Sequence, residues 1–276
     1  MLRALLMFVA TAGGACAHGL LHDQLAGLNR SIERTPANAA LYLKRGELHR
    51  LHRDWRAAEA DFDAVRQLDP DAIDVELARS RLATDRGLLP DADAALGRYL
   101  AARPDSEVAL AARADLRARM GAHSAAAADY ARAIRVSSDP RVEYYLGQAQ
   151  AQALANADDD SAALEVIAAG LARFGPLAVL EQWRVDVLVR ARRWDDALAH
   201  LDVMLDRAPR KETGLTRRAE ILLLAERPDE ARAAFDAART AWEALSEQQR
   251  ATQAMIELRH RIDTAIAAAP EVAARR

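Results

Sequence analysis

Three prolines recur at a fixed distance in the first part of the chain, and this spacing constrains the fold more than any other feature. Pro36, Pro70 and Pro104 each stand 34 residues apart. A period of this length is typical of chains that stack copies of one supersecondary unit, because a single copy cannot bury its apolar face alone. We therefore expect the 276 residues to form an array of repeats rather than two ordinary globular domains.

The copy that begins at Ala39 is the clearest. With Ala39 as position 1, it has Gly46 at position 8, Ala58 at position 20, Phe62 at position 24 and Pro70 at position 32. Small residues at 8 and 20, an aromatic residue at 24 and proline at 32 form a pattern that resembles the tetratricopeptide repeat. The resemblance implies two antiparallel helices in each repeat and a superhelix built by stacking them.

The same pattern predicts the domain organisation. Six copies follow one another at 39–72, 73–106, 107–140, 141–176, 178–211 and 212–245. In the fourth copy, Gly147 and Ala163 are 16 residues apart where the others have 12, which indicates a loop insertion. Residues 18–36 and 246–269 are predicted to be single helices that cap the two ends. The expected fold class is an all-α solenoid of about six tetratricopeptide-like helix pairs, forming one repeat domain over 18–276.

The first residues of the chain are typical of an export signal. Arg3 precedes a short apolar run at 4–10, and small residues follow it. We predict a signal peptide over 1–17 with cleavage after Ala17, which would make His18 the first mature residue and place the protein in the periplasm. The alternative is a lipoprotein that is acylated at Cys16 and anchored to a membrane through it.

Composition and motifs exclude several functional classes. Charged residues make up 29% of the chain with a net charge of −3, and arginine gathers in no single stretch, so nucleic-acid binding is not expected. Cys16 is the only cysteine, so no disulfide is expected. The sequence has no phosphate-binding loop, no HExxH motif and no Gly-x-Ser-x-Gly motif, so we predict a protein that is not an enzyme, with no cofactor and no metal site.

The resemblance also implies where a partner would bind. In the tetratricopeptide family the first helix of each pair lines the concave face, and side chains at positions 9, 12 and 13 point toward it. The candidate residues for binding a protein or peptide are Glu47, Arg50, Arg81, Asp85, Asp115, Arg119, Gln148, Asp186, Arg190 and Glu220. The alternative is that these side chains only cover solvated helix faces. Asp115 with Arg119, and Asp186 with Arg190, would then form ion pairs across one helical turn.

The resemblance and the N-terminal residues each raise one more specific function. Family members that clamp the terminal carboxylate of chaperones use Lys and Asn at set positions of the first helices. The corresponding residues here are Leu43, Glu47, Ala78, Val108 and Ala112. No chaperone binding of that kind is therefore expected. A copper-handling role for the mature amine and imidazole of His18, with His22 nearby, is an alternative, although two ligands do not complete a metal site.

Overall fold

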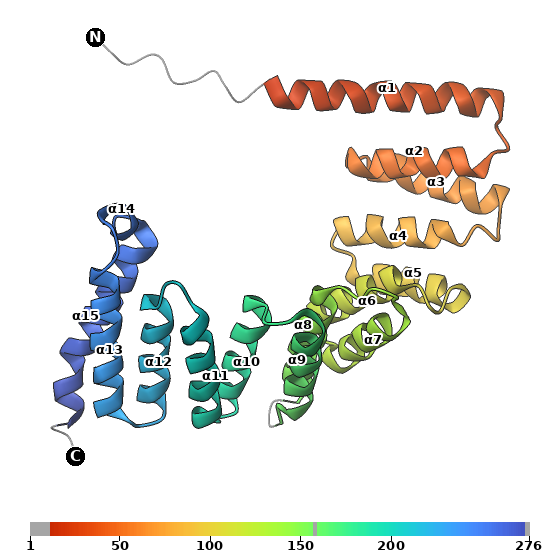
Figure 1. Ribbon diagram of the computed structural model, residues 1–276. Helices are drawn as coiled ribbons and strands as arrows, with labels where there is room; N and C mark the ends of the chain where they lie inside the picture. Colours follow the sequence, from red (N-terminus) through yellow and green to blue (C-terminus); the bar gives the residue numbers. More distant parts are fainter. Residues whose placement is uncertain (1–11, 157–158, 274–276) are drawn as a thin grey trace, which may run out of the picture. The chain divides into compact units, whose positions relative to one another are not determined.

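The computed structural model describes the backbone of residues 12–156 and 159–273, and the side chains from residue 22 to residue 268 within those ranges. The described residues form fifteen helices and no strand. They divide into two compact units, unit 1 ending at Pro140 and unit 2 beginning at Arg141 (Figure 1). The predicted all-α repeat fold is confirmed.

Unit 1 contains a single helix followed by three helix pairs. Its helices are α1 (Ala12–Arg34), α2 (Ala39–Leu51), α3 (Trp55–Leu68), α4 (Asp74–Asp85), α5 (Leu89–Ala102), α6 (Glu107–Arg119) and α7 (His123–Val136). Each helix packs against the next one along the chain, and α2 also contacts α4. Ile32 of α1 is buried, while its neighbours Glu33 and Arg34 are exposed, so α1 covers the first pair with one apolar stripe.

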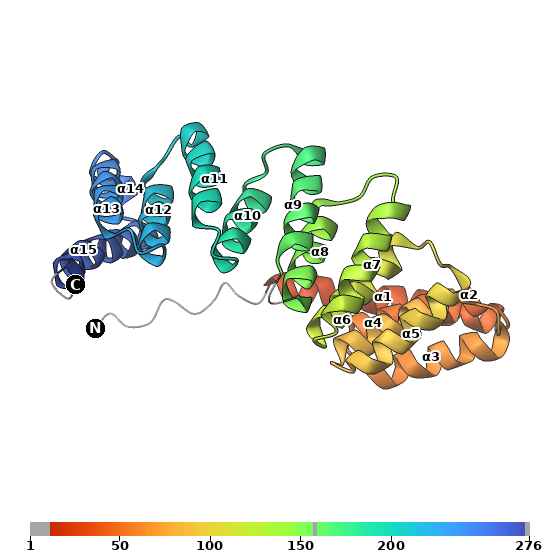
Figure 2. The ribbon, with the colours of Figure 1, turned by 90° about the horizontal axis from the view of Figure 1, so that it is seen from below.

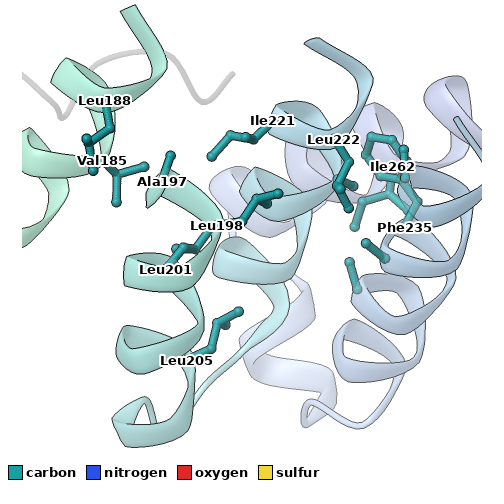
Figure 3. Close-up of a cluster of buried hydrophobic side chains, with 14 of the residues drawn as sticks. Val185, Leu188, Ala197, Leu198, Leu201, Leu205, Ile221, Leu222, Phe235 and Ile262 are labelled. Carbon is teal, nitrogen blue, oxygen red and sulfur yellow. The ribbon is translucent and has the colours of Figure 1, made fainter. Parts of the chain in front are cut away.

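Unit 2 contains three helix pairs followed by a four-residue helix and a long terminal helix, so the single helix predicted over 246–269 is divided in two. Its helices are α8 (Val142–Ala155), α9 (Ser161–Phe174), α10 (Ala178–Arg190), α11 (Trp194–Arg207), α12 (Glu212–Leu224), α13 (Pro228–Glu243), α14 (Glu247–Arg250) and α15 (Gln253–Ala273). Helices α10 to α13 lie side by side in chain order in both views (Figure 2). Helix α15 packs on α13, where Leu222, Phe235 and Ile262 meet in the core (Figure 3).

Small residues let the two helices of a pair approach closely. The alanines at position 20 of the six copies are at most 1% exposed: Ala58, Ala92, Ala126, Ala163, Ala197 and Ala231. At position 8 of the first copy, a Cβ atom added to Gly46 would lie 2.5 Å from Cε1 of Phe62. The aromatic ring at position 24 therefore occupies the space that the glycine leaves.

The turn between the two helices of a pair has one residue in the left-handed region. It stands at position 15 in five copies, at Arg53, Gly87, Gly121, Arg192 and Glu226, with φ between 55° and 78°. Glycine adopts this conformation without steric cost, whereas other residues are strained there. Two of the five copies have glycine at position 15. Glycine there marks the turn in the sequence, although position 15 is not part of the pattern of small residues and proline.

We predict that Gly46→Ala lowers the free energy of unfolding by roughly 1–3 kcal/mol, because the new methyl group would overpack the contact with Phe62. Gly97→Ala is the matched control in the same unit. A Cβ at Gly97, which lies inside α5, would meet no atom within 4 Å. That control should gain roughly 0.5–1 kcal/mol from helix propensity. Urea unfolding of both variants measures the two effects, and equal stability of the two would contradict the packing argument.

Candidate functional site

Four of the predicted partner-binding residues form one network in unit 1. Arg50 donates a hydrogen bond from Nε to Glu47 at 2.8 Å and also pairs with Asp85. Arg81 approaches Glu47 at 3.3 Å, so α2 and α4 are joined by charged side chains. The structure therefore brings these four residues together, but each of them already has a partner inside the protein.

The two predicted residues on α6 behave differently from each other. Asp115 accepts a hydrogen bond from the hydroxyl of Tyr130 on α7, and burial together with this bond raises the pKa of Tyr130. Arg119 is exposed, and no residue in the described part of the chain forms an ion pair with it. The ion pair expected between Asp115 and Arg119 across one helical turn is therefore not formed, because Asp115 turns to the tyrosine.

In unit 2, two of the predicted residues are linked through arginines that the sequence analysis did not single out. Asp186 of α10 pairs with Arg217 of α12 at 2.8 Å. Glu220 lies 3.7 Å from Arg217 and 3.4 Å from Arg261 of α15. Gln148 on α8 is half-buried and forms no hydrogen bond with the described residues.

Arg190 has a structural contact rather than the expected one. The interpretation of Asp186 and Arg190 as an ion pair is wrong, because Arg190 binds the carboxylate of Asp160, with Nε at 3.1 Å from Oδ2. Asp160 immediately precedes α9, and its side chain is only 4% exposed. A buried carboxylate requires such a partner. Arg190 therefore holds the start of α9 against α10, and changing it would disturb the fold as well as any binding.

Exposed apolar residues lie on or next to the same helices and were not among the predicted binding residues. Position 13 carries Leu51 at the end of α2 and Leu224 at the end of α12, which are 58% and 54% exposed. Met120, next to Arg119, is 37% exposed. Reading position 13 in every copy would have found both leucines, since Asp85, Arg119 and Arg190 occupy the same position.

A second set of charges lies between the two helices of each pair. Position 7 is arginine in five copies, at Arg45, Arg79, Arg113, Arg184 and Arg218. In the first and third copies this arginine grips the aspartate at position 23 with two hydrogen bonds. Arg45 binds Asp61 at 2.9 and 2.6 Å, and Arg113 binds Asp129 at 2.8 and 2.7 Å. Both aspartates are buried, so these bidentate pairs satisfy charge inside the helix pair.

The fifth copy replaces the aspartate by a histidine. His200 stands at position 23 beside Arg184, and neither Nε2 of the histidine nor Nε of the arginine has a hydrogen-bond partner among the described residues. Burial lowers the pKa of His200, and the charge of Arg184 lowers it further. Glu181 raises it, and Arg207 opposes that effect. The folded protein therefore favours the neutral imidazole at this position.

The described part of the chain contains neither a candidate membrane span nor a candidate metal cluster. None of the described helices is long and apolar enough to cross a membrane. The described side chains contain no cluster of three or more His, Cys, Asp and Glu residues that could hold a metal ion. The backbone of α1 includes residues 16–18. The side chains of Cys16 and His18, and residues 1–11 of the signal peptide predicted over 1–17, lie outside the described part. The copper and acylation hypotheses therefore stay predictions.

We predict that His200 reduces stability as the pH falls. Its pKa is lower in the folded state than in the unfolded state, where it is about 6.5. The destabilising contribution of His200 is thus absent at pH values well above the unfolded pKa. It grows as the pH falls through the unfolded pKa toward the folded pKa. His200→Asp should pair with Arg184, raise the urea midpoint at pH 7.5 and reduce its decrease between pH 7.5 and pH 5.5. Replacement of the exposed His260 by glutamine is the control. An equal decrease of the urea midpoint in wild type and in His200→Asp would contradict the prediction.

The fold is shared with solved tetratricopeptide-repeat structures. The C-terminal part of a repeat-containing protein from Cytophaga hutchinsonii aligns with a TM-score of 0.66 at 10% identity, covering 88% of this chain and 95% of that chain. A tetratricopeptide repeat protein from Parabacteroides merdae aligns with a TM-score of 0.52 at 18% identity, covering 90% and 94%. A structure of Naa15/Naa10 bound to HypK-THB aligns with a TM-score of 0.57 at 16% identity, covering 85% and 36%.

The similarity lies in structure rather than in sequence. No protein-family model matches the sequence, and no curated protein is similar to it in sequence. At identities of 18% or less, these solved structures establish the fold alone, so a binding site has to be inferred from this chain's own residues. The helix pairs, the small residues at positions 8 and 20 and these alignments together show that the chain has the tetratricopeptide-repeat fold.

Proposed function

We propose that this protein is a non-catalytic scaffold that binds a protein partner on the face formed by the first helix of each pair. In unit 1 this face belongs to α2, α4 and α6. The proposal rests on one observation: exposed apolar side chains and an exposed arginine occur together at the ends of these helices. Exposed Leu51 and Met120 accompany Arg119, a guanidinium that no described residue pairs with. Protein interfaces are enriched in methionine and arginine and have apolar centres.

The charged network beside these residues would give the face its specificity. Glu47, Arg50 and Asp85 hold one another in place, so a partner would meet side chains that are already ordered. Ordering side chains before binding reduces the entropy lost on association. A related fold occurs in the structure of Naa15/Naa10 bound to HypK-THB, which supports a role in assembly for this type of array.

We also propose that the protein is exported, either released into the periplasm or anchored through Cys16. Arg3, the apolar run at 4–10 and the small residues before His18 support this proposal. Mass spectrometry of the N-terminus of protein purified from its native cells tests it. A free His18 indicates cleavage by a signal peptidase, and an acylated Cys16 indicates the lipid-anchored form. An intact chain beginning at Met1 would exclude both.

Charge reversal at Arg119 tests the binding face. Arg119→Glu should weaken recovery of the partner by roughly tenfold, because an interface arginine meets complementary charge in the complex. The fold should be unaffected, since Arg119 is exposed and no described residue depends on it. The partner would be identified by crosslinking in native cells, and its recovery on each variant would then be compared with purified components.

The matched control is Arg56→Glu. Arg56 is also exposed and without an ion-pair partner among the described residues, but it lies on α3, a second helix of a pair. Recovery on this control should equal that of wild type. Loss of binding in Arg56→Glu with retention in Arg119→Glu would place the partner on the second helices and overturn the proposal.

A further inference from the structure

The turns that join the two helices of each pair in unit 1 carry exposed apolar side chains. Leu51 ends α2, Leu88 precedes α5 and Met120 follows α6, and each of them is at least 37% exposed. Only two other large apolar side chains are exposed among the described residues of unit 1, Leu68 and Val108. Exposed apolar surface in this unit is therefore concentrated at residues 51–54, 86–88 and 119–122, which we call the turn edge.

Ion pairs show that these turns are neighbours. Arg50, near the end of α2, pairs with Asp85, at the end of α4. Arg117, near the end of α6, pairs with Asp93, near the start of α5, at 2.8 Å. Each of these pairs joins one copy to the next, so the exposed apolar side chains form one row across the three copies.

The turn edge also has a surplus of positive charge. Arg53 and Arg119 are exposed, and neither forms an ion pair with a described residue. Arg86 is paired with a carboxylate of α3. The carboxylate of Asp54 accepts a backbone hydrogen bond at the start of α3. Asp91 lies beyond the edge, in the first turn of α5, where the helix N-terminus favours negative charge. Two arginines are therefore left for the acidic groups of a partner.

The turns themselves require neither Arg53 nor Leu88. Arg53 has a φ of 60°, a conformation for which the second and third copies use glycine. Leu88 occupies the N-cap position of α5 without capping it, whereas Asp54 caps α3 in the first copy. The third copy also lacks a cap, but its residue at this position is the small Ala122. Both side chains can therefore be replaced by smaller ones with the fold retained.

We propose that the turn edge binds an amphipathic helix of a partner protein, one with an apolar stripe and acidic flanks. The stripe packs on Leu51, Leu88 and Met120. The acidic side chains face Arg53 and Arg119, because a carboxylate is the bidentate acceptor that suits a guanidinium. Packed helices lie about 8–10 Å apart, so the turns of successive copies are separated by about the same distance. One face of a helix recurs every seven residues, about 10.5 Å along its axis, so a single helix can contact all three copies.

This inference rests on the proposed function, since it names the kind of partner protein and extends the binding face to the turns. The face in the proposed function belongs to the first helices and includes Arg119. Leu88 and Arg53 lie in the turns that follow those helices. Variants at these two residues therefore test the turn edge separately from the first-helix face.

Two variants remove these contacts while favouring the fold. Leu88→Ser deletes the apolar group and offers a hydroxyl that can cap α5. Arg53→Gly deletes the charge and relieves the left-handed turn. Each variant should keep or raise the melting temperature of the full chain, so a loss of binding is separated from a loss of folding.

The probe is a fluorescent synthetic helix of three heptads, with one leucine in each heptad, glutamates on both sides of it and alanines elsewhere. Its binding to the full chain is measured by fluorescence anisotropy. Wild type should bind the probe, because the leucines meet the apolar row and the glutamates meet the two arginines. Leu88→Ser and Arg53→Gly should each raise the dissociation constant at least fivefold.

Each variant has a matched control elsewhere in the chain. Ala122→Ser makes the same N-cap change in the third copy, and Arg192→Gly makes the same turn change in unit 2. Both controls should leave the dissociation constant of the probe within twofold of wild type. A probe with glutamine in place of glutamate should bind at least tenfold more weakly. The difference between the two probes should shrink at high salt, because salt screens exposed charges.

Several outcomes would overturn the inference. Failure of wild type to bind the glutamate probe, or equal binding of the glutamate and glutamine probes, would show that no acidic helix is recognised. Unchanged probe binding in both Leu88→Ser and Arg53→Gly would place the site elsewhere. Binding of wild type to phosphatidylglycerol vesicles that Leu88→Ser abolishes, without binding of the probe, would assign the edge to a lipid surface. Self-association that Arg53→Gly abolishes would assign it to a second copy of this chain.

The natural partner distinguishes this inference from the proposed function. Loss of the partner on Arg119→Glu with full recovery on Leu88→Ser and Arg53→Gly would reject the turn edge and leave the first-helix face intact. Full recovery on all three variants would reject both. Loss on all three, with wild-type recovery on the matched controls, is the result that we expect.

Discussion

The close approach of the two helices within each pair is the constraint on which the rest of the structure depends. It requires almost no side chain at positions 8 and 20, and Gly46 and Ala58 meet that requirement beside the buried ring of Phe62. Once the backbones are close, the apolar stripe of each pair must be covered by the next pair, so the array propagates. Terminal helices with one apolar and one polar face, such as α1 and α15, then close the ends.

Close packing also decides where charge can be placed. An arginine at position 7 lies between helices and needs a carboxylate within reach, which Asp61 and Asp129 supply in their copies. The second, fifth and sixth copies have Ala95, His200 and Ala234 at this place instead. In the second and sixth copies the arginine pairs with an aspartate of the preceding copy, Arg79 with Asp63 and Arg218 with Asp202. In the second and fifth copies, Nε of Arg79 and Nε of Arg184 still have no acceptor among the described residues, and proteins tend to break local rules where they do something other than fold. The repeats thus provide an internal standard against which a single substitution becomes visible.

The fold could be predicted from the sequence because proline spacing and small residues report directly on the repeat. The charged face could be predicted only in outline. Positions on one helix place Glu47 and Arg50 correctly, but partners lie on neighbouring helices, as Arg217 shows by pairing with Asp186 thirty-one residues away. Sequence spacing of four residues suggested a bond from Asp186 to Arg190, whereas buried Asp160 attracts that arginine more strongly. Such competition depends on burial, which the sequence does not display.

The network at position 9 has a consequence for the order of the copies. Glu47, Arg81 and Asp115 occupy this position in the three copies of unit 1, and their charges alternate in sign. Charged atoms of Glu47 and Arg81 lie 3.3 Å apart, so these opposite charges attract each other between the first and second copies. Duplicating a copy, or exchanging the second copy with either neighbour, would bring like charges together at this position. The three copies share one backbone plan, but the positive charge at position 9 of the second copy favours its place between the two acidic ones.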